Sequence, residues 1–195
     1  MGGKGVRGFL LMIAWLGVVL TAPAFAAALQ QGPVPEGLPL SRAEQEAWVA
    51  ERLDGIIDAI EPISETSRVR RRLAHATFCL PQNLLGIAYY AFAEAIGSVL
   101  TTAEINEVTV VATRLPFGAS LGRYLFIPDV LLSERTVRHE YGHTMQGYRH
   151  GPFYLLLEGV VSFVRSTASI FFPAIAETYF DRWPESEADE LGAVR

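Results

Sequence analysis

The residues best suited to chemistry lie in the stretch RHEYGHTMQGYRHG, residues 138–151, which holds three of the four histidines of the chain. His139 and His143 are four residues apart, so on a helix, which turns about 100° per residue, they share one face. Two imidazoles placed in this way can reach one metal ion at about 2.0–2.1 Å. Glu140 lies at the margin of that face, where a carboxylate suits a general base acting on a metal-bound water. The alternative is a polar helix with two surface histidines.

A catalytic zinc site also needs a third protein ligand and an open fourth position. Of the remaining histidines, His75 lies in a polar stretch beside a run of arginines, which favours a structural position. His150 follows His143 by seven residues, and we expect it to contact the substrate or the transition state, or to end the helix. Neither of them is the expected third ligand.

The stretch WPESEADELG, residues 183–192, supplies a better candidate. Glu185 and Asp189 are four residues apart and share a helix face. Glu185 is the expected third ligand, and Asp189 is placed to accept a hydrogen bond from the outer ring nitrogen of a ligand histidine. Ala188 between them allows close helix packing. The alternative is that acidic residues near a helix N-terminus interact favourably with the helix dipole, which needs no metal.

HEYGH followed by ExxAD resembles the gluzincin zinc metallopeptidases, in particular their HtpX-like and CAAX-prenyl-protease-like members. The resemblance implies a zincin-like site, in which an HExxH helix and an ExxAD helix pack around one Zn2+ ion. It implies that His139, His143 and Glu185 bind the zinc. It also implies Glu140 as the base and Asp189 as the partner of a ligand histidine. The wider stretch HEYGHTMQ also resembles a group of small bacterial proteins.

These residues predict a zinc metallopeptidase that hydrolyses peptide bonds in the cell envelope. Glu140 would take a proton from a zinc-bound water and pass it to the leaving amine. The developing oxyanion needs a further donor. The candidates for this contact are Tyr148, His150, Arg165 and Tyr179. The expected strand at residues 123–128 precedes the motif helix and is a candidate edge to which an extended peptide substrate adds.

Two other classes of function fit the sequence. One is a catalytically inactive zinc-binding protein, in which the ion joins the helices of a small domain. The intact Glu140 opposes it, because a structural site needs no base. The other is a membrane-associated envelope protein with the apolar stretches 84–100 and 153–176 in lipid. Charged residues inside both stretches favour a protein interior or a cavity.

Residues 1–26 have the pattern of a secretory signal peptide. Lys4 and Arg7 precede the apolar stretch Phe9–Leu20, and Ala24-Phe25-Ala26 fits a small-x-small cleavage site. The alternative is an uncleaved membrane anchor. Either interpretation predicts an exported protein, periplasmic or in the cell envelope.

The rest of the chain predicts one domain, residues 41–195, after a linker at residues 27–40. Hydrophobic residues make up 50% of the chain and charged residues 19%, enough for a packed core. The single cysteine, Cys79, excludes an intramolecular disulfide. The net charge of −5 argues against a nucleic-acid partner, and the basic run at residues 68–72 lacks interleaved aromatic residues. The expected partner is a peptide or protein substrate.

The hydrophobic periodicity predicts a mainly α fold with a small β-sheet, an α+β domain. Ser41 and Glu44 form a capping box at the start of the first helix. Ser133 is the expected N-cap of the motif helix, which Gly151-Pro152 ends. The expected elements are helices at 41–62, 65–78, 133–150 and from 184 onward, strands at 107–113 and 123–128, and an apolar helix at 84–100.

Overall fold

A computed structural model describes residues 41–62, 64–115 and 118–194. The predicted signal peptide and linker lie outside these residues. The described elements show a mixed α+β fold, as the periodicity predicts. The helices are α3 (Arg42–Asp58), α4 (Glu65–Ala76), α5 (Leu80–Ala95), α6 (Glu134–His150), α7 (Val160–Phe171), α8 (Pro173–Glu177) and α9 (Glu185–Leu191). The strands are β1 (Val99–Ile105), β2 (Val108–Thr113), β3 (Ala119–Leu121) and β4 (Tyr124–Pro128), and the short turns are η1 (Asp129–Leu131), η2 (Gly151–Phe153) and the π-helical η3 (Leu155–Gly159).

The strands form one sheet in the order β1-β2-β4-β3. β1 and β3 pair antiparallel to their neighbours, whereas β2 and β4 are parallel. The strand at the expected position 123–128, β4, is therefore interior, and the hypothesis that it is a free edge is wrong. β3, which precedes it, is the edge strand next to the motif helix.

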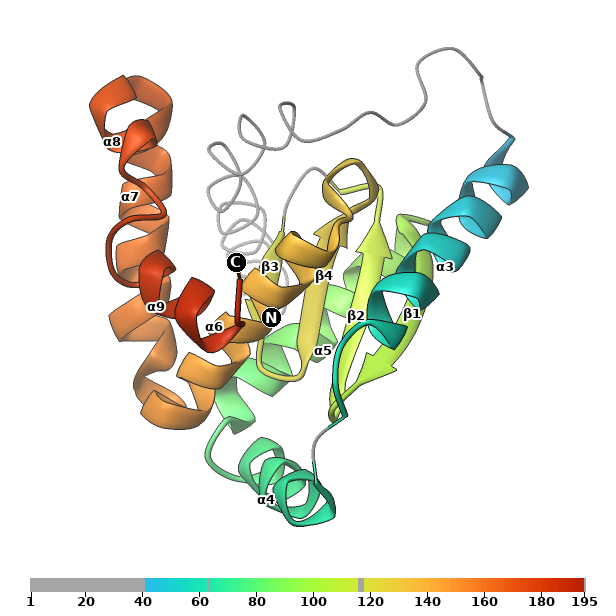
Figure 1. The fold of residues 1–195 in the computed structure, drawn as a ribbon, viewed down its shortest axis with the longest axis horizontal. Helices are drawn as coiled ribbons and strands as arrows, with labels where there is room; N and C mark the ends of the chain where they lie inside the picture. Colours follow the sequence, from blue (N-terminus) through green and yellow to red (C-terminus); the bar gives the residue numbers. More distant parts are fainter. Residues whose placement is uncertain (1–40, 63, 116–117, 195) are drawn as a thin grey trace, which may run out of the picture.

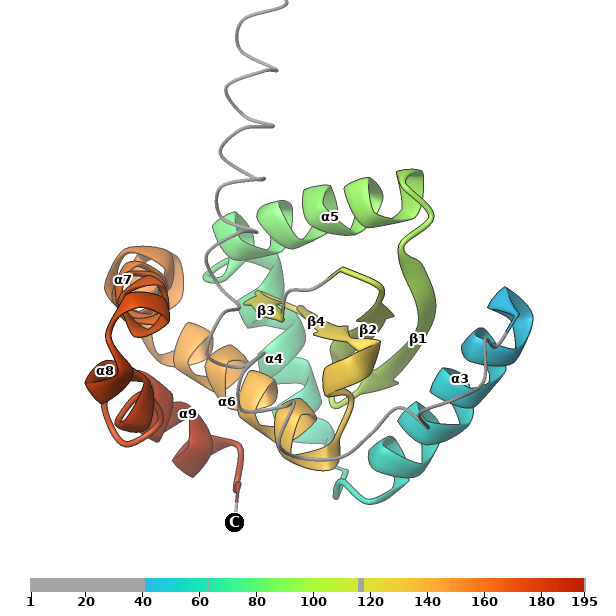
Figure 2. The ribbon, with the colours of Figure 1, turned by 90° about the horizontal axis from the view of Figure 1, so that it is seen from above.

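The two faces of the sheet carry separate parts of the core. Val110 packs with Leu53 of α3 on one face, and Val111 packs with Tyr89 of α5 on the other. Neighbouring residues of a strand point to opposite faces, so both faces of β2 must be covered by helices. Figure 2 shows α3 and α5 on opposite sides of the sheet, with α6 on the same side as α3.

The predicted caps are confirmed. Ser41 accepts a hydrogen bond from the main chain of Glu44, whose carboxylate accepts one from the main chain of Ser41. Ser133 caps α6 by accepting from the N–H of Thr136. These contacts satisfy main-chain donors that a helix start leaves unpaired.

Both long apolar stretches divide into more elements than expected. The stretch at 84–100 was expected to be one helix, but α5 ends at Ala95 and β1 starts at Val99. Gly97 has a φ of 65° at this turn, which glycine adopts readily. The stretch at 153–176 passes through η3, α7 and α8. Within the described residues, no helix is long and apolar enough to cross a bilayer.

The helices after the sheet form a second layer beside α6. α9 folds back along α6, and α7 and α8 stand outside it (Figure 1). This arrangement brings the end of the chain against the helix that carries HEYGH. Main-chain contacts at Gly142 and Gly192 set how closely these two helices approach.

Candidate metal centre

α6 and α9 touch through their main chains. An added Cβ on Gly142 would lie 1.9 Å from the carbonyl oxygen of Ala188, and one on Gly192 would lie 1.9 Å from that of Arg138. Both distances are far below van der Waals contact, so only glycine fits at either position. Gly142 lies between the two motif histidines. It therefore sets the distance at which α9 crosses the HEYGH segment.

This packing brings three potential ligands together. The Nε2 atoms of His139 and His143 each lie 3.2 Å from Oε2 of Glu185, the first residue of α9. One donor atom from each residue lies within 4.8 Å of the other two. Glu185 is 1% exposed, so its carboxylate is removed from bulk water. The group could hold a metal ion.

The outer nitrogens of both rings have acceptors. Asp189 Oδ1 lies 2.5 Å from Nδ1 of His139, as predicted for this pair. Oε1 of Gln146 lies 2.8 Å from Nδ1 of His143, and the amide nitrogen of Gln146 donates to the main-chain oxygen of Pro184, which fixes the orientation of the amide. These acceptors favour the tautomers that carry the proton on Nδ1 and leave the Nε2 lone pairs for a cation.

The carboxylate of Glu185 is held at its other oxygen. Oε1 accepts hydrogen bonds from the hydroxyl of Tyr179 at 2.9 Å and from that of Ser162 at 2.5 Å. Tyr179 was expected to be a candidate for contact with the transition state. The structure places its hydroxyl on the third ligand instead, where it orients the carboxylate.

The site favours positive charge between these side chains. Burial lowers the pKa of His139, but its hydrogen bonds to Asp189 and Glu185 outweigh burial and raise the pKa to about 10. Burial also lowers the pKa of His143. The negative charge of Glu185 and its hydrogen bond raise this pKa by more, so the net change is upward. For Glu185, burial raises the pKa, but the charge and hydrogen bonds of the two histidines hold it well below its ordinary value. A proton or a metal cation can supply this charge.

The side chain of Glu140, a residue of the motif helix, points toward the edge strand β3. Its Oε2 is 2.5 Å from the hydroxyl of Ser120 in β3, which also lies 2.8 Å from the main-chain oxygen of Glu140. An added Cβ on Gly118 would lie 3.1 Å from Oε1. The negative charge of Glu140 contributes to the raised pKa values of both His139 and His143. The carboxylate of Glu140 therefore belongs to the motif but not to the ligand group, and it is held by Ser120 of β3.

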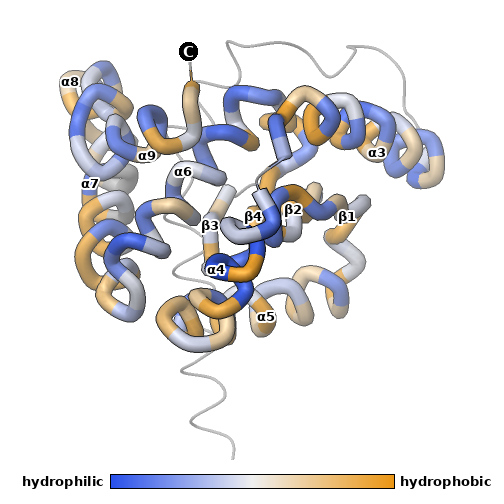
Figure 3. Tube along the Cα trace, turned by 60° about the horizontal axis from the view of Figure 1, so that its bottom comes forward, coloured by the Kyte–Doolittle hydropathy of each residue, from blue (hydrophilic) through white to orange (hydrophobic). Residues whose placement is uncertain are grey.

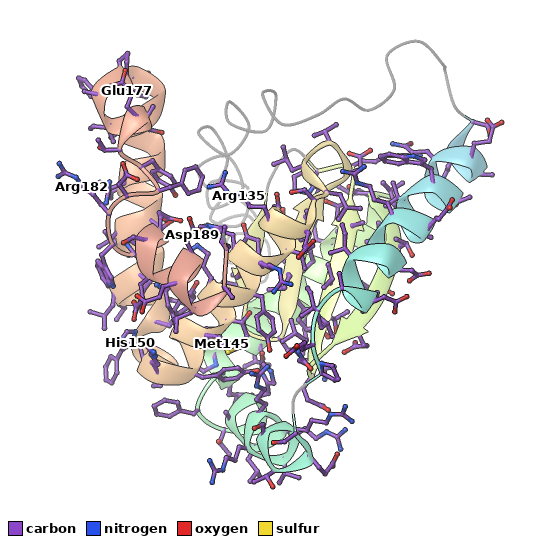
Figure 4. All side chains as sticks on the ribbon, viewed as in Figure 1. Arg135, Met145, His150, Glu177, Arg182 and Asp189 are labelled. Atoms are coloured by element: carbon purple, nitrogen blue, oxygen red, sulfur yellow. The ribbon has the colours of Figure 1, made fainter. Side chains whose placement is uncertain are left out.

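The other residues expected to contact the transition state lie elsewhere. The hydroxyl of Tyr148 is 2.6 Å from Nε2 of His75. The ring of His150 lies against the buried carboxylate of Glu158 at the end of α6. In Figure 4 it lies well away from Asp189, which is beside Arg135.

Arg165, the fourth residue expected at the transition state, also binds elsewhere. Its guanidinium donates to the main-chain oxygens of Trp183 and Thr178. Arg165 therefore ties α7 to the loop before α9. Within the described residues, no hydrogen bond or ion pair of His150 or Arg165 involves a candidate ligand, whereas Tyr148 lines a small cavity together with His143.

A residue that the sequence did not single out, Tyr154, lies in the same cavity beside His143 as Tyr148. Tyr154 lines a small cavity together with His143, Thr144 and Gly147. Burial, then the negative charges of Glu140 and other carboxylates, raise its pKa well above the ordinary value, so its hydroxyl keeps its proton. Among the described residues, no group accepts a hydrogen bond from this hydroxyl.

The comparisons with known proteins identify no relative. No protein-family model matches the chain, and no curated protein or solved structure is significantly similar to it.

The distances within the three-residue group can be compared with those around a bound metal ion. Ligands at about 2.0–2.1 Å from a tetrahedral ion lie about 3.3 Å from one another. The two separations between a histidine Nε2 and Oε2 of Glu185 are 3.2 Å, which agrees with that spacing, and the whole group spans no more than 4.8 Å.

Proposed function

We propose that the chain is a zinc-dependent metallopeptidase of the gluzincin type that acts in the cell envelope. The observation that carries the proposal is the convergence of His139, His143 and Glu185, with Glu140 beside them. Two imidazoles and one carboxylate are a ligand set of catalytic zinc sites, which keep a fourth position open for water. The spacing of HExxH and ExxAD supports the same assignment.

The residues of the chain divide the chemistry between them. Zinc in such a site lowers the pKa of a water molecule to about 7 and polarises a carbonyl group. Glu140 accepts the proton of the attacking water and passes it to the nitrogen of the leaving amine. Ser120 holds the Glu140 carboxylate against β3 and so limits its rotation. Asp189 and Gln146 keep the ligand rings oriented during this transfer.

Tyr154 supplies the remaining electrostatic role in this proposal. Tyr154 lines the cavity next to His143, and its protonated hydroxyl is the proposed donor for the oxyanion that forms at the attacked carbonyl. Removing one such donor costs about 10²–10³ in kcat. A Tyr154→Phe variant should therefore lose kcat with little change in KM. Equal activity of variant and wild type would exclude Tyr154 from this role.

The sheet edge favours a peptide over other carbonyl substrates. β3 pairs with β4 along one edge, and the described residues include no strand paired with its other edge. Ser120 of this strand lies on Glu140, so β3 runs next to the proposed base, and because its three residues are buried, a peptide adds to the edge only after a rearrangement that exposes it. An extended peptide that adds to β3 would have main-chain hydrogen bonds along the edge.

The experiment compares the wild type with Glu140→Gln, using a peptide library as substrate. We expect about one zinc ion per chain in both proteins and hydrolysis only by the wild type, with a loss of about 10²–10⁴ on removal of the base. Glu134→Gln, on the same helix, is the matched control and should hydrolyse normally. Zinc in the wild type without hydrolysis of any peptide would support the alternative of an inactive zinc protein, and equal hydrolysis by Glu140→Gln would refute the role of the base.

A further inference from the structure

The exposed large apolar side chains are concentrated in two parts of the molecule. Within the described residues, all of them except Val130 and Trp183 lie in the segments 69–96 and 153–172. In α5, every exposed residue from Leu80 to Phe92 is apolar. The opposite cover of the sheet, α3, exposes none of its large apolar side chains to this degree. Large exposed apolar patches mark sites that bind a protein or a membrane.

The two segments meet in space. The amide of Gln82 in α5 donates to the main-chain oxygen of Gly151 in η2. The ring of Phe78 lies where a Cβ on Gly151 would be, at 2.3 Å. In Figure 3 the start of α5 and the segment that leads into α7 lie side by side and are rich in hydrophobic residues. We call this surface the apolar face, and define it by Leu80, Leu84 and Ile87 of α5 with Phe153, Leu156 and Leu157 of η2 and η3.

The helix that packs beside the start of α5 is basic although the chain has a net charge of −5. α4 carries Arg68, Arg70, Arg71 and Arg72 against one acidic residue, Glu65. Arg72 is paired with Glu107 and Arg68 lies 3.7 Å from Glu65, so the excess positive charge is centred on Arg70 and Arg71. Arg70 is exposed, and its guanidinium makes no hydrogen bond or ion pair within the described part of the chain. An apolar surface with the basic helix α4 packed at one end complements a layer of anionic headgroups over acyl chains.

We infer that the protein docks on the surface of a bilayer containing anionic lipid, with the apolar face inserted and the arginines at the headgroups. No described helix could span the bilayer, so the domain would lie on the membrane and not cross it. A second copy of the chain fits less well. Protein interfaces form about one hydrogen bond per 100–200 Å², whereas the exposed residues of α5 from Leu80 to Phe92 offer only apolar side chains. Two copies joined through the face would also bring their arginines together.

Environment-sensitive labels on the full chain test this inference without relying on hydrolysis. Leu84→Cys and Leu156→Cys place a nitrobenzoxadiazole label on the two halves of the apolar face. Val130→Cys is the matched control, because Val130 is 45% exposed but lies in η1 next to α3. The natural Cys79 is 2% exposed and will react slowly. Residues 1–26 are the same in all variants, so attachment through that segment alone would not distinguish the three positions.

With vesicles of phosphatidylcholine and phosphatidylglycerol, we expect blue-shifted emission and loss of iodide quenching at positions 84 and 156 but not at 130. Arg70→Gln in the labelled Leu84→Cys protein should weaken binding about fivefold, and Arg42→Gln on α3 should not. The inference fails if position 130 responds like the other two, or if positions 84 and 156 do not respond. It also fails if they shift without vesicles as protein concentration rises, which would identify a second copy as the occupant.

Discussion

Each ligand side chain of the candidate centre is held at the atom that faces away from the other two. Asp189 and Gln146 accept from the outer ring nitrogens, and Tyr179 and Ser162 donate to the outer oxygen of Glu185. This arrangement fixes the direction of three donor atoms before a cation arrives. Partners of this kind tune affinity because they set both orientation and basicity.

Replacement of Asp189 tests this effect at a single residue. In Asp189→Asn the outer nitrogen of His139 loses its charged acceptor, and zinc affinity should fall about 10–100-fold. The measurement is a competition titration with a chromogenic chelator. Arg135→Gln is the control, since Arg135 lies 3.9 Å from the other oxygen of Asp189 and its loss leaves the histidine contact intact. Equal losses in both variants would show that the ion pair matters and the hydrogen bond does not.

His75 provides a second test at the residue scale. Burial, assisted by the charge of Arg123, lowers the pKa of His75 to about 4, against about 6.5 in an unfolded chain. Between these pH values the unfolded chain binds the proton and the folded protein does not. Stability is therefore fully present above pH 6.5 and falls as the pH drops toward 4, by up to about 3 kcal/mol.

Denaturant unfolding at a series of pH values measures this contribution. His75→Gln removes the titrating group, so its free energy of unfolding should depend less steeply on pH between 4 and 6.5. The remaining slope reports the carboxylates and the other three histidines, which are the same in both proteins. Parallel pH profiles for variant and wild type would contradict the role given to His75.

The sequence indicated which three residues come together better than it indicated the residues that surround them. Helical spacing alone indicates that His139 and His143 share a face, and the same holds for Glu185 and Asp189. The hydrogen bond from Ser162 to Glu185 depends on how α7 packs against the site, which no local pattern encodes. The contact between Gln146 and His143 was partly indicated by the sequence, because residues three apart on a helix are neighbours.

At the scale of elements, the site depends on how closely α9 approaches α6. Gly142→Ala would place a methyl group 1.9 Å from the carbonyl oxygen of Ala188, so the helices must separate. Overpacking of this kind costs about 1–3 kcal/mol, and the separation moves Glu185 away from the histidines. We expect lower thermal stability and weaker zinc binding together.

Gly147→Ala is the matched control for this substitution. Gly147 lies in the same helix, and no atom outside the helix lies within 4 Å of its added Cβ. Alanine there should be neutral or stabilise by up to about 1 kcal/mol, because it is the better helix former. Normal zinc binding by Gly142→Ala would show that the contact between α6 and α9 does not set the ligand distances.

Elements with strong local signals were predicted, and those that depend on turns were not. The capping box at Ser41 and the β-branched run of β2 gave correct assignments. β1 was missed because its hairpin uses Asn106-Glu107, both with positive φ, where glutamate is uncommon. The apolar stretch 84–100, which we expected to be one helix, also includes the first two residues of β1.

In the whole molecule, the two faces of the sheet are covered by helices that expose different kinds of side chain to solvent. α3 covers one face and presents charged residues outward, whereas α5 covers the other and presents apolar ones. The sequence indicated that the stretches 84–100 and 153–176 are apolar, but it did not indicate which residues stay exposed. That distinction arises only when α5 and η2 meet at Gly151.

We propose that three side chains distant in sequence, His139, His143 and Glu185, form one metal site. Zinc content of the folded full-length chain, measured by mass spectrometry after equilibration with zinc and gel filtration, tests it most directly. We predict about one zinc ion per chain, and loss of that ion in His143→Ala and in Glu185→Ala. A folded wild-type chain without zinc, or unchanged zinc in both variants, would contradict the account.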